Sequence, residues 1–407
     1  MPAHYRSFRG SLPWLILLLQ ALLLLLFYFF VPEGAGPALS PGSAAFQDVS
    51  HMLLFGFGFS FLFLRRFGFS SIGLNLLLLV LGVQSSVLAE QALPVPLQRQ
   101  RLDGLQRITK AVVSMTAVVI STGAVLGKAN PVQLILMTVV EVLAFHGSRW
   151  LTQVFLQLPD SIPMRHVHLF GACFGLALSS RFSEPAPSSE KSRRTPRAEL
   201  LSMLGTLFLW LFWPSFNLLL DEEGRSRTIS NTYFALAAST VAAFVLSALT
   251  TKDGKFQMSH IQSAVLAGGV AVGSAAPRIE SPWIAMILGL LASLLTSLGA
   301  YCLQRCLNPA LKIHDTSGVH FTFGWPAVLG GLAQVVLLVV QNWDNLPSLG
   351  ALVMIHVGAF CLTISVASII GFITGSILNL RVFRTTPVSK YFEDQCYWEF
   401  PHLAVGF

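Results

Sequence analysis

Residues 166–176 read HVHLFGACFGL, an apolar run that contains two glycines and begins with two histidines. Asp160 lies eight residues before the second of these, His168. A bilayer offers no water to an imidazole, so an ionisable side chain inside it must be paired or must line a wet cavity. Such residues usually mark a path for a solute or a proton, and His168 is therefore the first candidate site residue.

The composition of the chain predicts a membrane protein. Its 407 residues are 54% hydrophobic and only 11% charged, whereas soluble domains carry about 25% charged residues. A helix needs about 20 apolar residues to cross a bilayer. Twelve segments meet that need, at 13–31, 47–64, 71–91, 108–127, 130–146, 164–181, 199–220, 231–250, 258–276, 282–304, 318–341 and 348–380.

The basic residues set the expected orientation. If the first ten residues are cytoplasmic, 17 of the 26 Lys and Arg residues fall on the cytoplasmic side. This bias predicts twelve helices with both termini cytoplasmic, and it explains the net charge of +7 better than nucleic acid does. We expect a transmembrane domain at 1–381 and a cytoplasmic tail at 382–407. The segment 13–31 resembles a signal peptide, but its length and its bulky exit favour a retained helix.

Other motifs are few. Cys302 and Cys306 stand at the expected inner end of a helix, where they are candidates for palmitoylation or remain plain thiols. The chain has no N-x-[ST] sequon, so we expect it to be non-glycosylated.

Glu141 is expected to pair with a hydroxyl or a backbone group between helices. Without a CxxC, an HExxH or a Walker loop, nothing predicts an enzyme, a metal or a cofactor. Small-residue stretches at 266–273 and 329–332 predict close helix packing.

Several stretches resemble the Rh branch of the ammonium transporter/Rh superfamily. They are GAVLGKANPVQL (123–134), HLFGACFGLAL (168–178), GTLFLWLFWPSFN (205–217), SHIQSAVLAGGVAVG (259–273) and IHDTSG (313–318). The tail KYFEDQCYWEFPHLAVGF (390–407) resembles that of the erythrocyte Rh blood-group polypeptides. The resemblance implies eleven core helices plus one N-terminal helix, assembled as a trimer with a pore in each conducting protomer.

The resemblance also assigns roles to pore positions. Asp160 matches an aspartate that orders a helix end, although an ordinary helix cap explains it equally well. His168 matches the first of two facing pore histidines, and Phe216 matches one of two stacked gate phenylalanines. The second histidine falls at Phe323, which cannot carry a proton, and the second gate ring falls at Val113.

Two further positions bear on that path. His320 lies three residues before Phe323 and is an alternative partner for His168, although the residues favour a lone His168 that is hydrogen-bonded to a neighbour and has no transport role. Arg149 falls where many conducting relatives have an acid, and a fixed positive charge there would repel ammonium.

Three functions follow from these observations. The first is a mainly structural and antigenic subunit of the Rh complex in the erythrocyte plasma membrane, with a degenerate pore. The resemblance implies that it would join the Rh-associated glycoprotein in a trimer and connect to the ankyrin-linked membrane skeleton, its other partner being membrane lipid. The second is a channel for neutral NH3 or CO2, which needs no proton relay. The third is an unrelated transporter or receptor.

Overall fold

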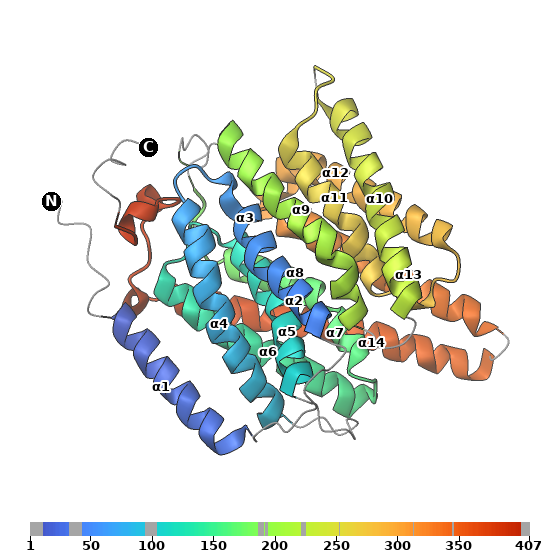
Figure 1. Ribbon diagram of the computed structural model, residues 1–407. Helices are drawn as coiled ribbons and strands as arrows, with labels where there is room; N and C mark the ends of the chain where they lie inside the picture. Colours follow the sequence, from blue (N-terminus) through green and yellow to red (C-terminus); the bar gives the residue numbers. More distant parts are fainter. Residues whose placement is uncertain are drawn as a thin grey trace.

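The computed structural model describes residues 11–31, 43–93, 104–185, 191, 194–220, 225–251, 253–311, 313–343 and 346–399. The side chains of residues 43, 225, 301–311 and 346–348 are not among the described ones. Within these ranges the chain is helical, and its single β-bridge joins Leu64 to Arg194. The expectation of an all-helical bundle is confirmed (Figure 1).

The helices follow the apolar segments closely. They are α1 (Leu12–Phe30), α2 (Ser43–His51), η2 (Met52–Phe57), α3 (Gly58–Ser60), η3 (Phe61–Phe63), α4 (Gly68–Ala92), α5 (Gly104–Ala124), α6 (Pro131–Leu156), α7 (Ser161–Arg165), α8 (Val167–Ser179), α9 (Pro196–Leu219), α10 (Arg225–Thr250), α11 (Met258–Gly273), η5 (Ala276–Arg278), α12 (Pro282–Leu311), η6 (His320–Gly324), α13 (Trp325–Gln341) and α14 (Leu346–Leu378). Short 3₁₀ turns η8 (Arg381–Phe383), η9 (Val388–Lys390) and η10 (Asp394–Cys396) follow.

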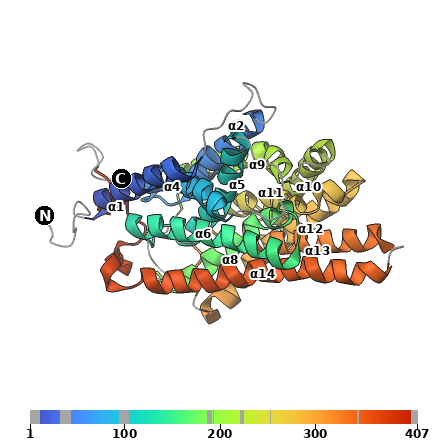
Figure 2. The same cartoon turned by 90° about the horizontal axis from the view of Figure 1, so that it is seen from below.

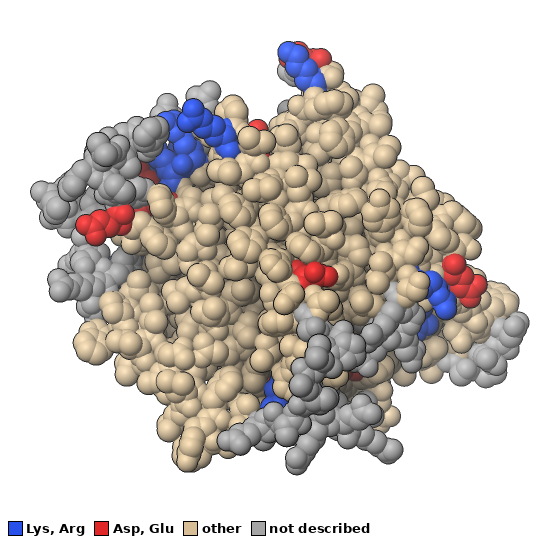
Figure 3. Space-filling model, in the orientation of Figure 1, with Lys and Arg blue, Asp and Glu red and all other residues tan. Residues whose placement is uncertain are grey.

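Each of the twelve expected spans overlaps a helix. Nine helical segments in the described ranges are long and apolar enough to cross a membrane. The other three expected spans coincide with α5, α8 and α11, and the last two have only 13 and 16 residues. Figure 3 shows a broad uncharged surface with Lys, Arg, Asp and Glu mostly near its margins, as expected of a chain surrounded by lipid.

Glycines allow the central helices to approach closely. A Cβ on Gly171 of α8 would lie 2.4 Å from the Ala117 carbonyl oxygen of α5, so no other residue fits without a shift. The predicted small-residue seams behave in the same way. A Cβ on Gly268 would lie 2.5 Å from the carbonyl oxygen of Ala235, and one on Gly330 would lie 2.3 Å from that of Ala271. The prediction of tight packing is confirmed.

Helix α1 lies at the edge of the bundle against α4 and α6 (Figure 2). Leu23 is its only buried residue. One polar contact fixes it: the Gln20 and Gln84 side-chain amides donate to each other's oxygens, at 2.8 and 3.3 Å. A paired amide satisfies groups that lipid cannot, so it favours one register of α1 on α4.

The segment after α14 folds back onto the bundle. Asp394 accepts hydrogen bonds from the backbone N–H groups of Phe69 and Ser70 at the start of α4, at 2.7 and 3.1 Å. The Trp398 indole donates to the Ser70 hydroxyl at 2.8 Å, and the Phe392 N–H donates to the Gly127 carbonyl at 2.9 Å. We call this end of the bundle the tail side and the opposite end, which carries Asp160, the far side. The start of α1 also lies on the tail side (Figure 1).

Candidate functional site

His168 lies in the first turn of α8, enclosed by aromatic rings. It is 2% exposed. The Trp213 ring stacks on it at 5.4 Å between centroids, and the Phe216 ring meets it edge-on at 5.2 Å. Its Nε2 atom has no hydrogen-bond partner among the described residues. The imidazole therefore occupies an apolar box, not a hydrogen-bonded pair.

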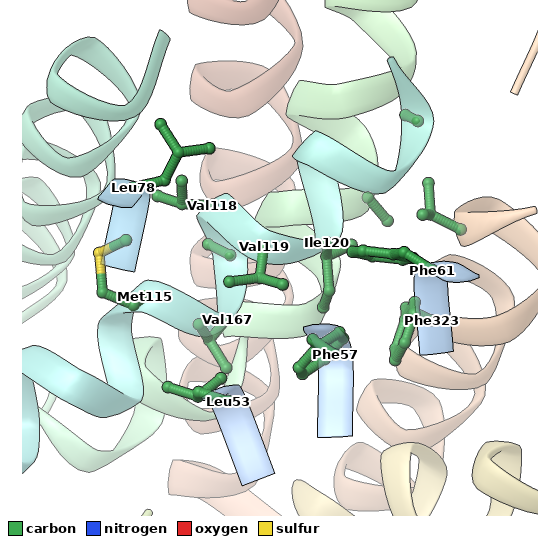
Figure 4. Close-up of a cluster of buried hydrophobic side chains, with 14 of the residues drawn as sticks. Leu53, Phe57, Phe61, Leu78, Met115, Val118, Val119, Ile120, Val167 and Phe323 are labelled. Atoms are coloured by element: carbon green, nitrogen blue, oxygen red, sulfur yellow. The ribbon is translucent and has the colours of Figure 1, made fainter. Parts of the chain in front are cut away.

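Phe323 closes that box on the tail side. It belongs to η6, a π-helical turn, and its ring lies nearly parallel to His168, 6.2 Å away with a 9° interplanar angle. It also stacks on Trp213 at 6.4 Å and lies 5.8 Å from Phe57 of η2, another π-helical turn (Figure 4). Two irregular turns thus bring two phenylalanines together where regular helices would direct them elsewhere. A ring that cannot carry a proton occupies the place next to His168.

His320 does not replace the missing imidazole. Its Nδ1 atom pairs with the Asp315 carboxylate at 2.5 Å, and its ring packs on Phe321. Burial disfavours ionisation of Asp315, but the hydrogen bonds from His320 hold the pKa of this carboxyl below its ordinary value. The alternative pairing of His320 with His168 is therefore not formed.

The gate positions lie on α5 and α9. Val113 and Phe216 are 1% and 0% exposed. Val113 supplies no ring, and Phe216 packs instead on His168 and, at 6.1 Å, on Trp213. The structure thus brings His168, Phe216 and Phe323 into one aromatic group.

Asp160 lies on the far side, before α7. Its carboxylate accepts from Arg149 Nη2 at 2.6 and 2.7 Å and from Arg149 Nε at 3.0 Å. The Gln153 amide donates to it at 2.7 Å and Lys110 Nζ at 3.3 Å. Although burial disfavours its charge, Arg149 and Lys110 lower the pKa of Asp160 to about 2. Its side chain makes no cap bond to α7, so the interpretation as an ordinary helix cap is wrong.

Arg149 does not present a free charge. It is 3% exposed, and besides Asp160 it lies 3.9 Å from the Glu90 carboxylate. His146 Nδ1 lies 3.2 Å from its Nη1 atom. The repulsion expected from an isolated arginine does not apply to this compensated group. Sequence reasoning missed the partners, but His146, Arg149 and Gln153 are spaced by three and four residues, which places them on one face of α6.

Other expected residues are placed as follows. Ser121 donates to the fully buried Glu141 carboxylate between α5 and α6, so that pairing is confirmed. The side chains of Cys302 and Cys306 lie outside the described residues.

A pocket opens on the tail side below Phe323, lined by hydroxyl groups that include those of Ser202 and Thr322. The aromatic box thus ends in a polar pocket on one side.

Comparison with known proteins agrees with this geometry. Residues 40–390 match the Ammonium Transporter Family. The chain is 41% identical to an RH-like protein of Macaca mulatta and 40% identical to the blood group Rh(CE) polypeptide of Homo sapiens, with 99% of both chains covered in each case.

Solved structures extend the likeness. Rh50 of Nitrosomonas europaea, whose structure addresses conduction by the Rhesus protein family of channels, has a TM-score of 0.75 and 30% identity. That match covers 89% of this chain and 92% of Rh50. Mep2 of Saccharomyces cerevisiae, at a TM-score of 0.65, 16% identity and coverage of 87% and 91%, shares the fold. The aromatic box lies within the matched stretch of this transporter and channel family, which is not a family of enzymes. The chain is a multi-pass membrane protein and belongs to the Ammonium Transporter Family, in its Rh branch.

Proposed function

We propose that this chain is a mainly structural and antigenic subunit of an oligomeric Rh complex, with a pore that does not relay protons. The observation that carries the proposal is the Phe323 ring stacked on His168. A lone imidazole buried among Trp213, Phe216 and Phe323 has no second base to share a proton with. Charging it there would place a cation in an apolar site, so ammonium deprotonation at His168 is disfavoured.

The complex would be a trimer in the erythrocyte plasma membrane that includes the Rh-associated glycoprotein. The tail side would be cytoplasmic, and residues 382–407 would face the ankyrin-linked skeleton. Docking of Asp394 and Trp398 on α4 supports a tail with a fixed shape that a partner can recognise. Palmitoylation of Cys302 and Cys306 would add a lipid anchor at this side. Co-purification with the Rh-associated glycoprotein from co-expressing cells tests the assembly; elution of the two chains as separate species contradicts it.

Methylammonium uptake tests the degenerate pore. Liposomes that contain this chain alone should take up methylammonium no faster than protein-free liposomes, while liposomes with Nitrosomonas Rh50 serve as the comparator. Phe323→His restores a second imidazole beside His168 and should raise uptake if the missing base is what limits it. A wild-type rate equal to that of Rh50 would overturn the proposal.

A second function is a channel for neutral NH3 or CO2. The buried, largely apolar side chains at Val113, Phe216, His168 and Phe323 favour it, because a neutral gas needs neither a charge nor a relay. Stopped-flow equilibration across proteoliposomes should then exceed that of empty liposomes. His168→Ala should change that rate, and an unchanged rate would reject this path.

A further inference from the structure

The pocket below Phe323 has an unusual charge balance. It lies between η3, α9, α11 and η6, and its fourteen lining residues include Arg194 but no Asp or Glu. A vestibule that attracts cations would be expected to carry carboxylates. This pocket instead carries one guanidinium and many hydroxyl groups.

Arg194 is held at the pocket without an acidic partner. Its backbone forms the β-bridge to Leu64, and its guanidinium lies 4.5 Å over the Phe63 ring. In the described part of the chain this guanidinium forms no ion pair or hydrogen bond. Glu199 acts on it only from beyond ion-pair distance and does not line the pocket. Within the described ranges its N–H donors are therefore unpaired, and a planar guanidinium fits the oxygens of a phosphate group.

Other polar side chains line the same pocket. Ser317 is one of them, and its hydroxyl, which is packed toward Gly123 and Phe61, has no partner among the described residues. Ser259 and Ser263 line it from the first turns of α11, a 16-residue helix whose N-cap, Gln257, makes no side-chain cap bond. The helix dipole attracts an anion at such a start.

We propose that this pocket binds a phosphate group, carried either by the headgroup of an anionic lipid on the tail side or by free inorganic phosphate. The group would meet Arg194 and the serine hydroxyls at the start of α11. A bound group would also lie directly below Phe323 and would obstruct the tail-side end of the path. The proposal is independent of the proposed function, since it holds for a conducting and for a closed pore.

Binding to the full-length protein tests the site. Titration of inorganic phosphate onto the purified chain in detergent, followed by calorimetry, gives the dissociation constant for the free ion. Native mass spectrometry then measures how much phosphatidic acid the protein retains from phosphatidylcholine nanodiscs. This retention reports binding of a lipid headgroup. Arg194→Gln should weaken binding about tenfold because the bidentate contact is lost. Arg197→Gln, an exposed arginine outside the lining, should change it less than about twofold.

A second pair of variants tests the charge of the pocket. Ser263→Asp places a carboxylate in the lining and should abolish binding, whereas Ser263→Asn adds similar volume without charge and should retain it. Size-exclusion profiles and melting temperatures confirm that each variant folds. Phosphatidic acid retention without phosphate binding identifies the lipid headgroup as the ligand, and binding of both probes identifies the phosphate group itself. Absence of binding by the wild type, equal losses in Arg194→Gln and Arg197→Gln, or wild-type binding by Ser263→Asp would each overturn the proposal.

Discussion

Asp160 and Asp394 lie near opposite ends of α4 and are stabilised in different ways. Among the described residues, Asp160 accepts from side chains alone, those of Arg149, Gln153 and Lys110. Asp394 accepts from backbone N–H groups at the start of α4, about 35 Å away along a 25-residue helix. The far side is thus locked by charge pairs within the bundle. The tail side is closed by the segment after α14, which caps α4 through Asp394. Removing this segment would not leave a buried cation without its partner.

The largest effect is expected at the far side. Arg149→Met leaves the Asp160 carboxylate buried without its main partner, which should lower the free energy of unfolding by about 3–5 kcal/mol. Denaturant unfolding in detergent measures it. The double variant with Asp160→Asn should recover part of the loss, because the carboxylate of residue 160 is then no longer a buried charge without its arginine. A loss below about 1 kcal/mol in the single variant would show that the ion pair is not what locks this end.

A smaller effect is expected at the tail side. Asp394→Asn weakens the cap on α4 and should cost about 1–2 kcal/mol. Hydrogen exchange at the Phe69 and Ser70 amides should accelerate while the far-side helices remain protected. Glu399→Gln removes a nearby but exposed carboxylate and serves as the control. Unchanged exchange at both amides would mean that the tail does not hold this end.

The smallest effect concerns pH. Burial lowers the pKa of Lys128, between α5 and α6, from 10.5 to about 7, against the opposing effect of Asp315 and Glu184. Between these values the unfolded chain binds more protons, so the free energy of unfolding should rise with pH, by at most about 1.4 kcal/mol per unit. Below pH 7 Lys128 is protonated in both the folded and the unfolded chain, so its contribution to the free energy of unfolding no longer changes with pH. Denaturation at pH 7 and 8 should show a rise of about 1 kcal/mol in the wild type, and Lys128→Met should remove it. Equal slopes in both proteins would assign the rise to other groups.

The helices could be predicted because a bilayer demands about 20 apolar residues, whatever they pack against. The contacts that define the two ends could not. Gln157 adopts a left-handed φ of 52°, and the chain then turns Asp160 back onto Arg149, eleven residues earlier. The local sequence does not predict a left-handed backbone at a glutamine, because this conformation is uncommon for residues other than glycine. Asp394 is further still from its partner, 324 residues after Ser70, and its role rests on where the tail folds.

The pore residues were predictable in identity but not in geometry. The motif resemblance placed His168, Phe216 and Phe323 on one path, and the structure brings their rings together. The π-helical turns that aim Phe57 and Phe323 at each other have no signature in an apolar run, because one extra residue per turn leaves composition unchanged. Likewise the binding partner of His320, Asp315, lies in the loop before the helix and falls outside any helical periodicity.

The amide pair that fastens α1 has a genetic consequence. Gln84 also donates to the Val80 carbonyl at 3.1 Å, but its side-chain oxygen accepts from Gln20 across the helices, so loss of either glutamine leaves amide groups of the other without this partner in lipid. A second change at the other position, to leucine for instance, removes the stranded group and restores an apolar contact. Single substitutions at either position should therefore be selected against. A substitution at one position should be tolerated when the other position changes with it.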